Sequence, residues 1–353
     1  MNLNFIEKIS KDSDENVIDY QISILKITAL WAFSESAFGG ILHALAIPFR
    51  GIFINGAAVL FISLIALFSK NSKEILKSTL IVMLIKALVS PHTPLTAYFA
   101  VSIQGLLGYL LFLSKSFFRI STLLLGILTL FFSGIQKIIV LSLLFGNTLW
   151  KSINIFVKQI SKEFFGLSVN SDLNFGLILI GIYISVHVVS GIFIGFYAGM
   201  LPQKINFYRN QIPKDLLLET VEQIPKKVKK KKNWLLRPTG VIIIFISISV
   251  LIYSYISPST SEIRSSEIVI MLIRSVTIMI IWFTLIGPIV RKLFQKFLSG
   301  KKSFYAKEIE EIMQLFPMFK KVVSYCWKNS SDKNGIKRLR KFLSTSFYYL
   351  LLR

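Results

Sequence analysis

Long apolar runs separated by short polar segments dominate the chain from residue 22 onward. A helix needs about 20 apolar residues to cross the hydrocarbon core of a membrane, and these runs approach or exceed that length. The pattern predicts an all-α integral membrane protein with eight transmembrane helices. The predicted spans are residues 22–46, 52–69, 76–90, 95–114, 118–147, 174–200, 239–257 and 267–290.

The third run is short and ends at Ser90-Pro91-His92-Thr93-Pro94. Proline lacks an amide hydrogen and interrupts a helix, so two prolines so close together predict a turn or a re-entrant corner. Whether residues 76–90 cross the membrane fully stays open at this point.

Composition supports the membrane class. Of the 353 residues, 53% are hydrophobic, 17% are charged and 30 are Phe, which excludes a disordered chain. The single cysteine, Cys326, excludes an internal disulfide and a cysteine-based metal cluster. The acidic first twenty residues lack the basic start of a signal peptide, so we expect the first span to be retained.

The net charge of +23 is unevenly distributed. Residues 1–200 hold 14 basic and 9 acidic residues, whereas residues 201–353 hold 27 and 9, so +18 of the total lies in the second part. The basic residues flank apolar spans without any nucleic-acid-binding motif, so we expect no nucleic-acid partner. The positive-inside rule then places both termini in the cytoplasm of a multi-pass protein of the inner membrane.

The same pattern divides the chain into four parts. Residues 1–200 form a six-helix membrane unit, and residues 201–238, rich in proline and lysine, form a basic cytoplasmic linker. Residues 239–290 form a two-helix unit. Residues 291–353 are basic, with apolar positions three and four apart, which predicts amphipathic helices lying on the membrane or against a partner.

Small residues recur every four positions in the first span, at Ala32, Ser36, Gly40 and Ala44. Such a stripe lets another helix approach closely. Two uses are open: packing inside this chain, or docking of a separate membrane subunit.

Glu35 lies at membrane depth, where an ionised side chain needs a partner or water. Lys86 in the third span and Lys137 in the fifth are the available cations, and Arg50 follows the first span. A Glu35–lysine pair accounts for only one lysine. The other motivates the hypothesis that Lys86 and Lys137 face the carboxylate or phosphate of an anionic substrate.

Further polar side chains occur in the same spans. His43 and His92 are expected near the outer face and His187 deeper, and Gln104 and Gln136 add buried amides that need partners. The separations of the histidines and Glu35 match no metal-ligand spacing, so neither a metal nor another cofactor is expected.

No nucleophile elbow, P-loop or zinc-protease motif occurs in the sequence, so we expect no enzyme activity and no ATP hydrolysis by this chain. Glu35 and His43, eight residues apart, are the one pair that suggests acid–base chemistry, for example on a lipid head group.

The six helices with both ends inside, the small-residue stripe and the polar residues toward the outer half resemble the substrate-binding S component of energy-coupling factor (ECF) vitamin transporters. The resemblance covers about residues 20–200. In that family, a small-residue face on the first helix docks the transmembrane T component, which implies this role for Ala32, Ser36, Gly40 and Ala44.

The family takes up a small vitamin or metal from outside, with cytoplasmic ATPases as further partners. By analogy of position in the fold, rather than through a matched motif, the resemblance implies that the substrate is bound by Glu35, His43, Lys86, His92 and Lys137.

The start Met1-Asn2-Leu3 lacks the Met-x-His of cobalt and nickel S components. The additional 150 or so C-terminal residues are faintly similar to a T component, without its Ala-Arg-Gly motifs. The resemblance thus implies uptake of a small, vitamin-like metabolite, and the lysines at membrane depth favour an anionic one. A lipid-modifying enzyme and a scaffold whose basic tail binds anionic lipid are the alternatives.

Overall fold

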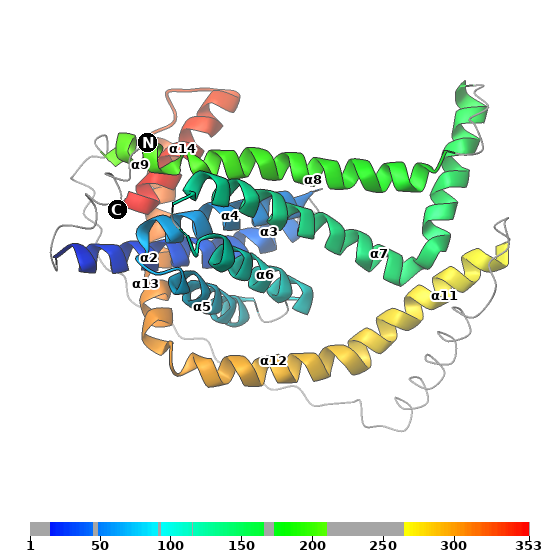
Figure 1. Ribbon diagram of the computed structural model, residues 1–353, viewed down its shortest axis with the longest axis horizontal. Coiled ribbons are helices and arrows are strands. Elements are labelled where there is room, and N and C mark those ends of the chain that lie inside the picture. Colours follow the sequence, from blue (N-terminus) through cyan, green and yellow to red (C-terminus); the bar gives the residue numbers. More distant parts are fainter. Residues whose placement is uncertain are drawn as a thin grey trace. The chain divides into compact units, whose positions relative to one another are not determined.

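The computed structural model of the protein consists of helices, with no strand among the residues that it describes (Figure 1). This confirms the all-α fold class. The described residues are 15–44, 49–90, 93–114, 116–165, 173–209 and 265–352.

The helices follow one another with short connections. In the first part of the chain they are α2 (Glu15–Phe33), the π-helical turn η1 (Ser34–Phe38), α3 (Gly39–Ala44), α4 (Arg50–Phe68), α5 (Lys73–Val89), α6 (Leu95–Leu111), α7 (Phe118–Phe165), α8 (Phe175–Gly199) and α9 (Leu201–Arg209). In the last part they are α11 (Ser265–Ile281), the π-helical turn η2 (Trp282–Ile286), α12 (Gly287–Lys302), α13 (Ala306–Lys328) and α14 (Gly335–Leu352).

Four of these helical segments are long and apolar enough to cross a membrane: Arg50–Phe68, Phe118–Phe164, Phe175–Gly199 and Val269–Lys302. The protein is therefore membrane-embedded by the composition of its helices. The number of eight spans stays a prediction, and the predicted span 239–257 lies outside the described residues.

Several helix ends coincide with features of the sequence. The Asn71 side-chain oxygen accepts the amide hydrogen of Lys73 at the start of α5, and Asn174 does the same for Leu177 at the start of α8. Helix α5 ends at Val89 and α6 begins directly after Pro94. The interruption predicted from the two prolines is thus confirmed.

Helix α7 contains a break at Gly146, whose φ of 66° lies in the left-handed region that glycine adopts without steric strain. The break falls at the end of the predicted span 118–147. The helix then continues to Phe165, beyond the predicted end of the span at residue 147.

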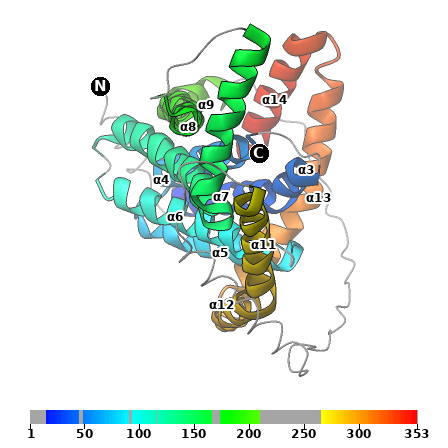
Figure 2. The ribbon, with the colours of Figure 1, turned by 90° about the vertical axis from the view of Figure 1, so that its right-hand side faces the viewer.

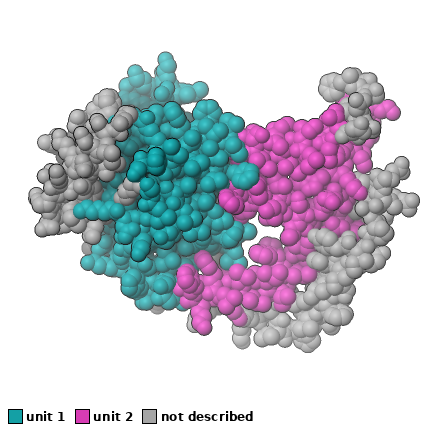
Figure 3. Space-filling view, viewed as in Figure 1, with its two compact units in different colours: residues 1–131, 188–224, 298–353 teal, residues 132–187, 225–297 magenta. Residues whose placement is uncertain are grey.

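Contacts group the chain into two compact units (Figure 3). Unit 1 comprises residues 1–131, 188–224 and 298–353, and unit 2 comprises residues 132–187 and 225–297. Each unit therefore combines segments that are far apart in the sequence. The four-part division expected from the sequence stays a prediction.

Unit 1 is built around α2, which packs against α4 and α5, while α6 packs against α5 and α4. The buried side chains between these helices are mainly aliphatic, together with the fully buried Trp31. These helices run side by side, and α13 runs across them (Figure 1).

The C-terminal helices α13 and α14 belong to the same unit. Helix α13 packs on α2 and α5, and α14 packs on α13, α2 and α9. Glu308 pairs with Lys77 of α5 at 3.2 Å, and the rings of Phe316 and Phe33 lie 5.7 Å apart. One side of the predicted amphipathic tail therefore packs on helices of its own chain.

Unit 2 contains the rest of α7, the first half of α8, and α11 with most of α12. The Trp150 indole nitrogen donates to the Ser142 hydroxyl at 3.0 Å, so the two parts of α7 bridge the break at Gly146. Asn154 of α7 donates to the Asn174 side chain at 2.9 Å and accepts the amide hydrogen of Gly176 at 2.8 Å. These contacts join α7 to the start of α8.

Candidate binding site in unit 1

Glu35 lies on a local widening of the first helix. The π-helical turn η1 replaces the α-helical hydrogen bonds over Ser34–Phe38. Serine favours such a departure because its hydroxyl competes for backbone groups, and the Ser36 hydroxyl donates to the Ala32 carbonyl at 2.5 Å. π-helical turns are frequent at functional sites, and this one carries the first span's only buried acid.

The Glu35 carboxylate forms a buried ion pair. The Lys86 ammonium of α5 donates to Glu35 Oε2 at 2.6 Å, and the side chains of Lys86 and Glu35 are only 5% and 3% exposed. The second carboxylate oxygen, Oε1, is buried and has no hydrogen-bond partner among the described residues. A buried carboxylate oxygen without a hydrogen bond is costly unless another group donates to it.

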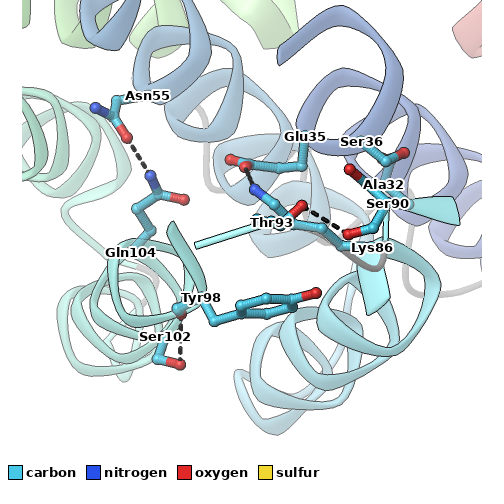
Figure 4. A network of polar contacts seen from close by, with 10 residues as sticks. All are labelled: Ala32, Glu35, Ser36, Asn55, Lys86, Ser90, Thr93, Tyr98, Ser102 and Gln104. Atoms are coloured by element: carbon cyan, nitrogen blue, oxygen red, sulfur yellow. Dashed lines mark hydrogen bonds and ion pairs between the residues drawn. The ribbon is translucent and has the colours of Figure 1, made fainter. Parts of the chain in front are cut away.

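A second polar pair lies in the same bundle. The Gln104 amide nitrogen of α6 donates to the Asn55 side-chain oxygen of α4, and both residues are buried. Gln104 Oε1 also has no partner within the described part of the chain. Figure 4 shows this pair in the same view as Glu35 and Lys86, together with the buried ring of Tyr98.

Buried donors and acceptors without a hydrogen-bond partner among the described residues lie on the first helix, in and just before the π-helical turn, and on α6. Trp31 Nε1 can only donate, and the Ser34 hydroxyl can donate or accept. Glu35 Oε1 and Gln104 Oε1 can only accept. These atoms leave hydrogen-bonding capacity of both donor and acceptor kind unused among the described residues of unit 1.

Two of the predicted site residues, Glu35 and Lys86, form an ion pair, and Gln104 lies in the same unit, where it pairs with Asn55. Gln136 and Lys137 of α7 belong to unit 2, where Gln136 is half-buried and Lys137 is exposed. Of the two lysines proposed as partners of Glu35, the structure selects Lys86.

Of the three histidines considered from the sequence, the structure describes the side chain of His187. His92 and the side chain of His43 lie outside what the structure describes. His187 is 1% exposed, and its Nδ1 lies 2.9 Å from the Tyr183 carbonyl oxygen. Across the described residues, no group of three or more His, Cys, Asp or Glu could hold a metal ion.

The small-residue stripe of the first span is divided between two environments. Ala32 and Ser36 are buried within unit 1, whereas Gly40 is exposed, and a Cβ placed on it would have no described atom within 4 Å. Ala44 ends α3, and its side chain lies outside what the structure describes. The π-helical turn lies between Ala32 and Gly40 and rotates the later position relative to the earlier one, so Gly40 does not share the buried face of Ala32 and Ser36.

A different small-residue stripe, which was not predicted from the sequence, joins two helices closely. A Cβ at Gly191 would lie 2.6 Å from the Gly126 carbonyl oxygen, and one at Gly195 would lie 2.7 Å from the Thr122 carbonyl oxygen. Gly199 continues the spacing of four. The signal was present in the sequence as Gly191-x-x-x-Gly195-x-x-x-Gly199.

Two polar residues were also missed. Asn55 is the buried partner of Gln104. Arg274 lies within the predicted span 267–290 and is 8% exposed, and a Cβ at Gly146 would lie 2.1 Å from its guanidinium. A search for every ionisable or amide side chain inside a span would have found both.

Comparison of the chain with protein-family models, with curated proteins and with solved structures found no match.

Proposed function

We propose that the protein is a membrane transport protein that binds a small polar metabolite among the helices of unit 1. The observation that carries the proposal is the Glu35 carboxylate, which is held by Lys86 through one oxygen while its other oxygen is buried without a partner among the described residues. Ionisable residues at membrane depth are expensive, and where they occur they usually mark substrate or ion pathways.

The chemistry of the site favours a ligand with amine, amide or hydroxyl donors. Glu35 already neutralises Lys86. The acceptors Glu35 Oε1 and Gln104 Oε1 call for donors on the ligand. The anionic ligand expected from the sequence depended on a second cation, and Lys137 is exposed in unit 2.

The proposed mode of action is that of an S component, in which the chain captures its ligand from outside and partner proteins drive release inward. The partners that this proposal implies are a T component and cytoplasmic ATPases. Gly40, where a Cβ would have no described atom within 4 Å, is the position proposed to contact the T component. The inner membrane, with both termini in the cytoplasm, is the proposed location because the basic residues gather at predicted inner loops.

Mass spectrometry of small molecules that purify with the protein tests the proposal. The full chain is extracted from its own membrane in mild detergent, as wild type and as Glu35→Gln. The wild type is expected to carry a polar metabolite at close to one molecule per chain. Glu35→Gln is expected to lose most of the metabolite, because a neutral amide oxygen accepts weaker hydrogen bonds than a charged carboxylate oxygen.

Lys137→Ala is the matched control because Lys137 is a membrane-depth cation outside the cluster, and it should retain the metabolite. A wild-type protein that contains no metabolite, or a Glu35→Gln variant that retains it in full, would contradict the proposal.

A further inference from the structure

The turn between α13 and α14 forms the exposed tip of a helical hairpin with an unusual surface. Three apolar side chains at the start of α14, Ile336, Leu339 and Leu343, follow a spacing of three and four and are all exposed, Ile336 to 86%. Residues at this spacing share one face of a helix. Trp327, at the end of α13, is also about half exposed.

The same tip is strongly basic. Six basic residues lie between Lys328 and Lys341, against the single acid Asp332. That acid is already engaged, because the Lys341 ammonium donates to it at 2.8 Å. Lys337 and Arg340 are exposed on the same turn of helix as the apolar side chains.

The structure holds the tip in a defined shape. The Arg338 guanidinium lies 4.3 Å from the centre of the Trp327 ring, and the Phe342 ring meets Trp327 edge-on at 5.1 Å. These contacts connect the two helices at the tip. The exposed apolar face of α14 is thus presented by an ordered hairpin.

Helix α14 is attached to helices that can cross the membrane. The Tyr348 hydroxyl lies 3.3 Å from the hydroxyl of Tyr197, near the end of α8, and the Phe347 ring lies 6.2 Å from that of Phe61 in α4. Figure 2 views α8 end-on and shows α13 and α14 from the side, so the hairpin runs across the direction of α8. A hairpin fixed to the end of a span and running across it extends along the membrane surface.

We propose that this tip docks on the surface of the surrounding bilayer, with Ile336, Leu339 and Leu343 inserted at the boundary of the acyl chains and Lys337 and Arg340 contacting anionic lipid head groups. An apolar helix face flanked by cations and a tryptophan is the composition that binds an anionic membrane interface. The attachment to α8 places lipid, rather than a soluble protein, within reach.

The test uses the full chain in lipid vesicles, with Ile336→Cys in a Cys326→Ser background and an environment-sensitive fluorophore on the new cysteine. One set of vesicles contains phosphatidylcholine alone, and the other contains about 30% phosphatidylglycerol, within the anionic range that basic segments detect. Lipids with a quencher near the head group report contact. Quenching is expected in the anionic vesicles and should fall at least about twofold in neutral ones.

The variant Lys337→Glu/Arg340→Glu should reduce quenching in anionic vesicles to the neutral level. Lys301→Glu/Lys302→Glu changes the net charge equally at two exposed lysines of α12 and should leave the quenching unchanged. A fluorophore that stays unquenched in both kinds of vesicle would overturn the proposal and point to a protein partner. Equal quenching in both would overturn the role of anionic head groups.

Discussion

At the scale of single residues, the stability of unit 1 depends on the buried ion pair between Glu35 and Lys86. Both side chains are buried, so removing one partner leaves a charge without compensation at a cost of about 3–5 kcal/mol. Removing both leaves no charge. We expect Lys86→Met to lower the midpoint of thermal unfolding in detergent, and Glu35→Gln/Lys86→Met to recover most of that loss.

Differential scanning fluorimetry measures these midpoints. Lys137→Met serves as the control because it removes an exposed lysine, and it should unfold at the wild-type temperature. Equal midpoints for Lys86→Met and the wild type would show that the pair is not buried.

A second residue-scale prediction concerns Cys326, which packs with Val322 and Tyr349 between α13 and α14. Burial raises the pKa of the Cys326 thiol, and the nearby Ser346 side chain lowers that pKa by a smaller amount. Only the thiolate reacts with maleimides, so labelling at pH 8 should be slow in the folded protein. Tyr349→Ala should accelerate it about tenfold or more, because truncating the cluster favours local opening.

Phe304→Ala is the matched control for this labelling, since Phe304 is an aromatic residue that is 76% exposed. Rapid labelling of the wild type would mean that α14 does not cover Cys326.

The sequence predicted the site only in part at this scale. It showed that Glu35 needs a cation at its own depth, but Lys86 and Lys137 satisfied that requirement equally. The choice depends on how each helix is rotated and on which helices are neighbours, and Lys86 faces η1 because α5 packs against it. Neither property can be read from the depth of a residue in its span.

At the scale of helices, close packing of α7 and α8 depends on glycine. Because a side chain at Gly195 would collide with backbone atoms of α7 at 2.7–3.0 Å, Gly195→Leu should force the two helices apart. We expect a lower unfolding midpoint and a lower yield of folded protein in size-exclusion chromatography. Overpacking of this kind costs about 1–3 kcal/mol or more.

Gly181→Leu is the matched control on the same helix, because no described atom lies within 4 Å of a Cβ placed there. If Gly195→Leu is as stable as Gly181→Leu, the helices are not packed at this stripe.

The apolar runs predicted where helices lie along the chain better than they predicted which side of each helix is buried. The prolines before α6 and the glycine at position 146 mark interruptions through local backbone chemistry, which the sequence states directly. The π-helical turn η1 is different, since one extra residue in a turn changes the faces of all later positions without changing composition. This is why Gly40 does not share the buried face of Ala32 and Ser36.

At the scale of the whole molecule, the positions of the basic residues predict the orientation in the membrane. We expect the lysine-rich segment around Lys230 to be cytoplasmic and the segment around Gln159 to be outside. In a Cys326→Ser background, a membrane-impermeant maleimide should label Gln159→Cys in intact cells and Lys230→Cys only after lysis. The opposite pattern would reverse the orientation.

The proposed function requires that the buried pair of Glu35 and Lys86 serves a ligand as well as holding the helices together. Native mass spectrometry of the wild type and of the charge-swapped variant Glu35→Lys/Lys86→Glu tests this, because the swap keeps an ion pair but inverts the groups presented to a ligand. We expect the wild type to carry a small molecule in addition to the 40.2 kDa chain, and the variant to be folded but without a bound molecule. A wild type without a bound molecule, or the same bound mass in both proteins, would contradict it.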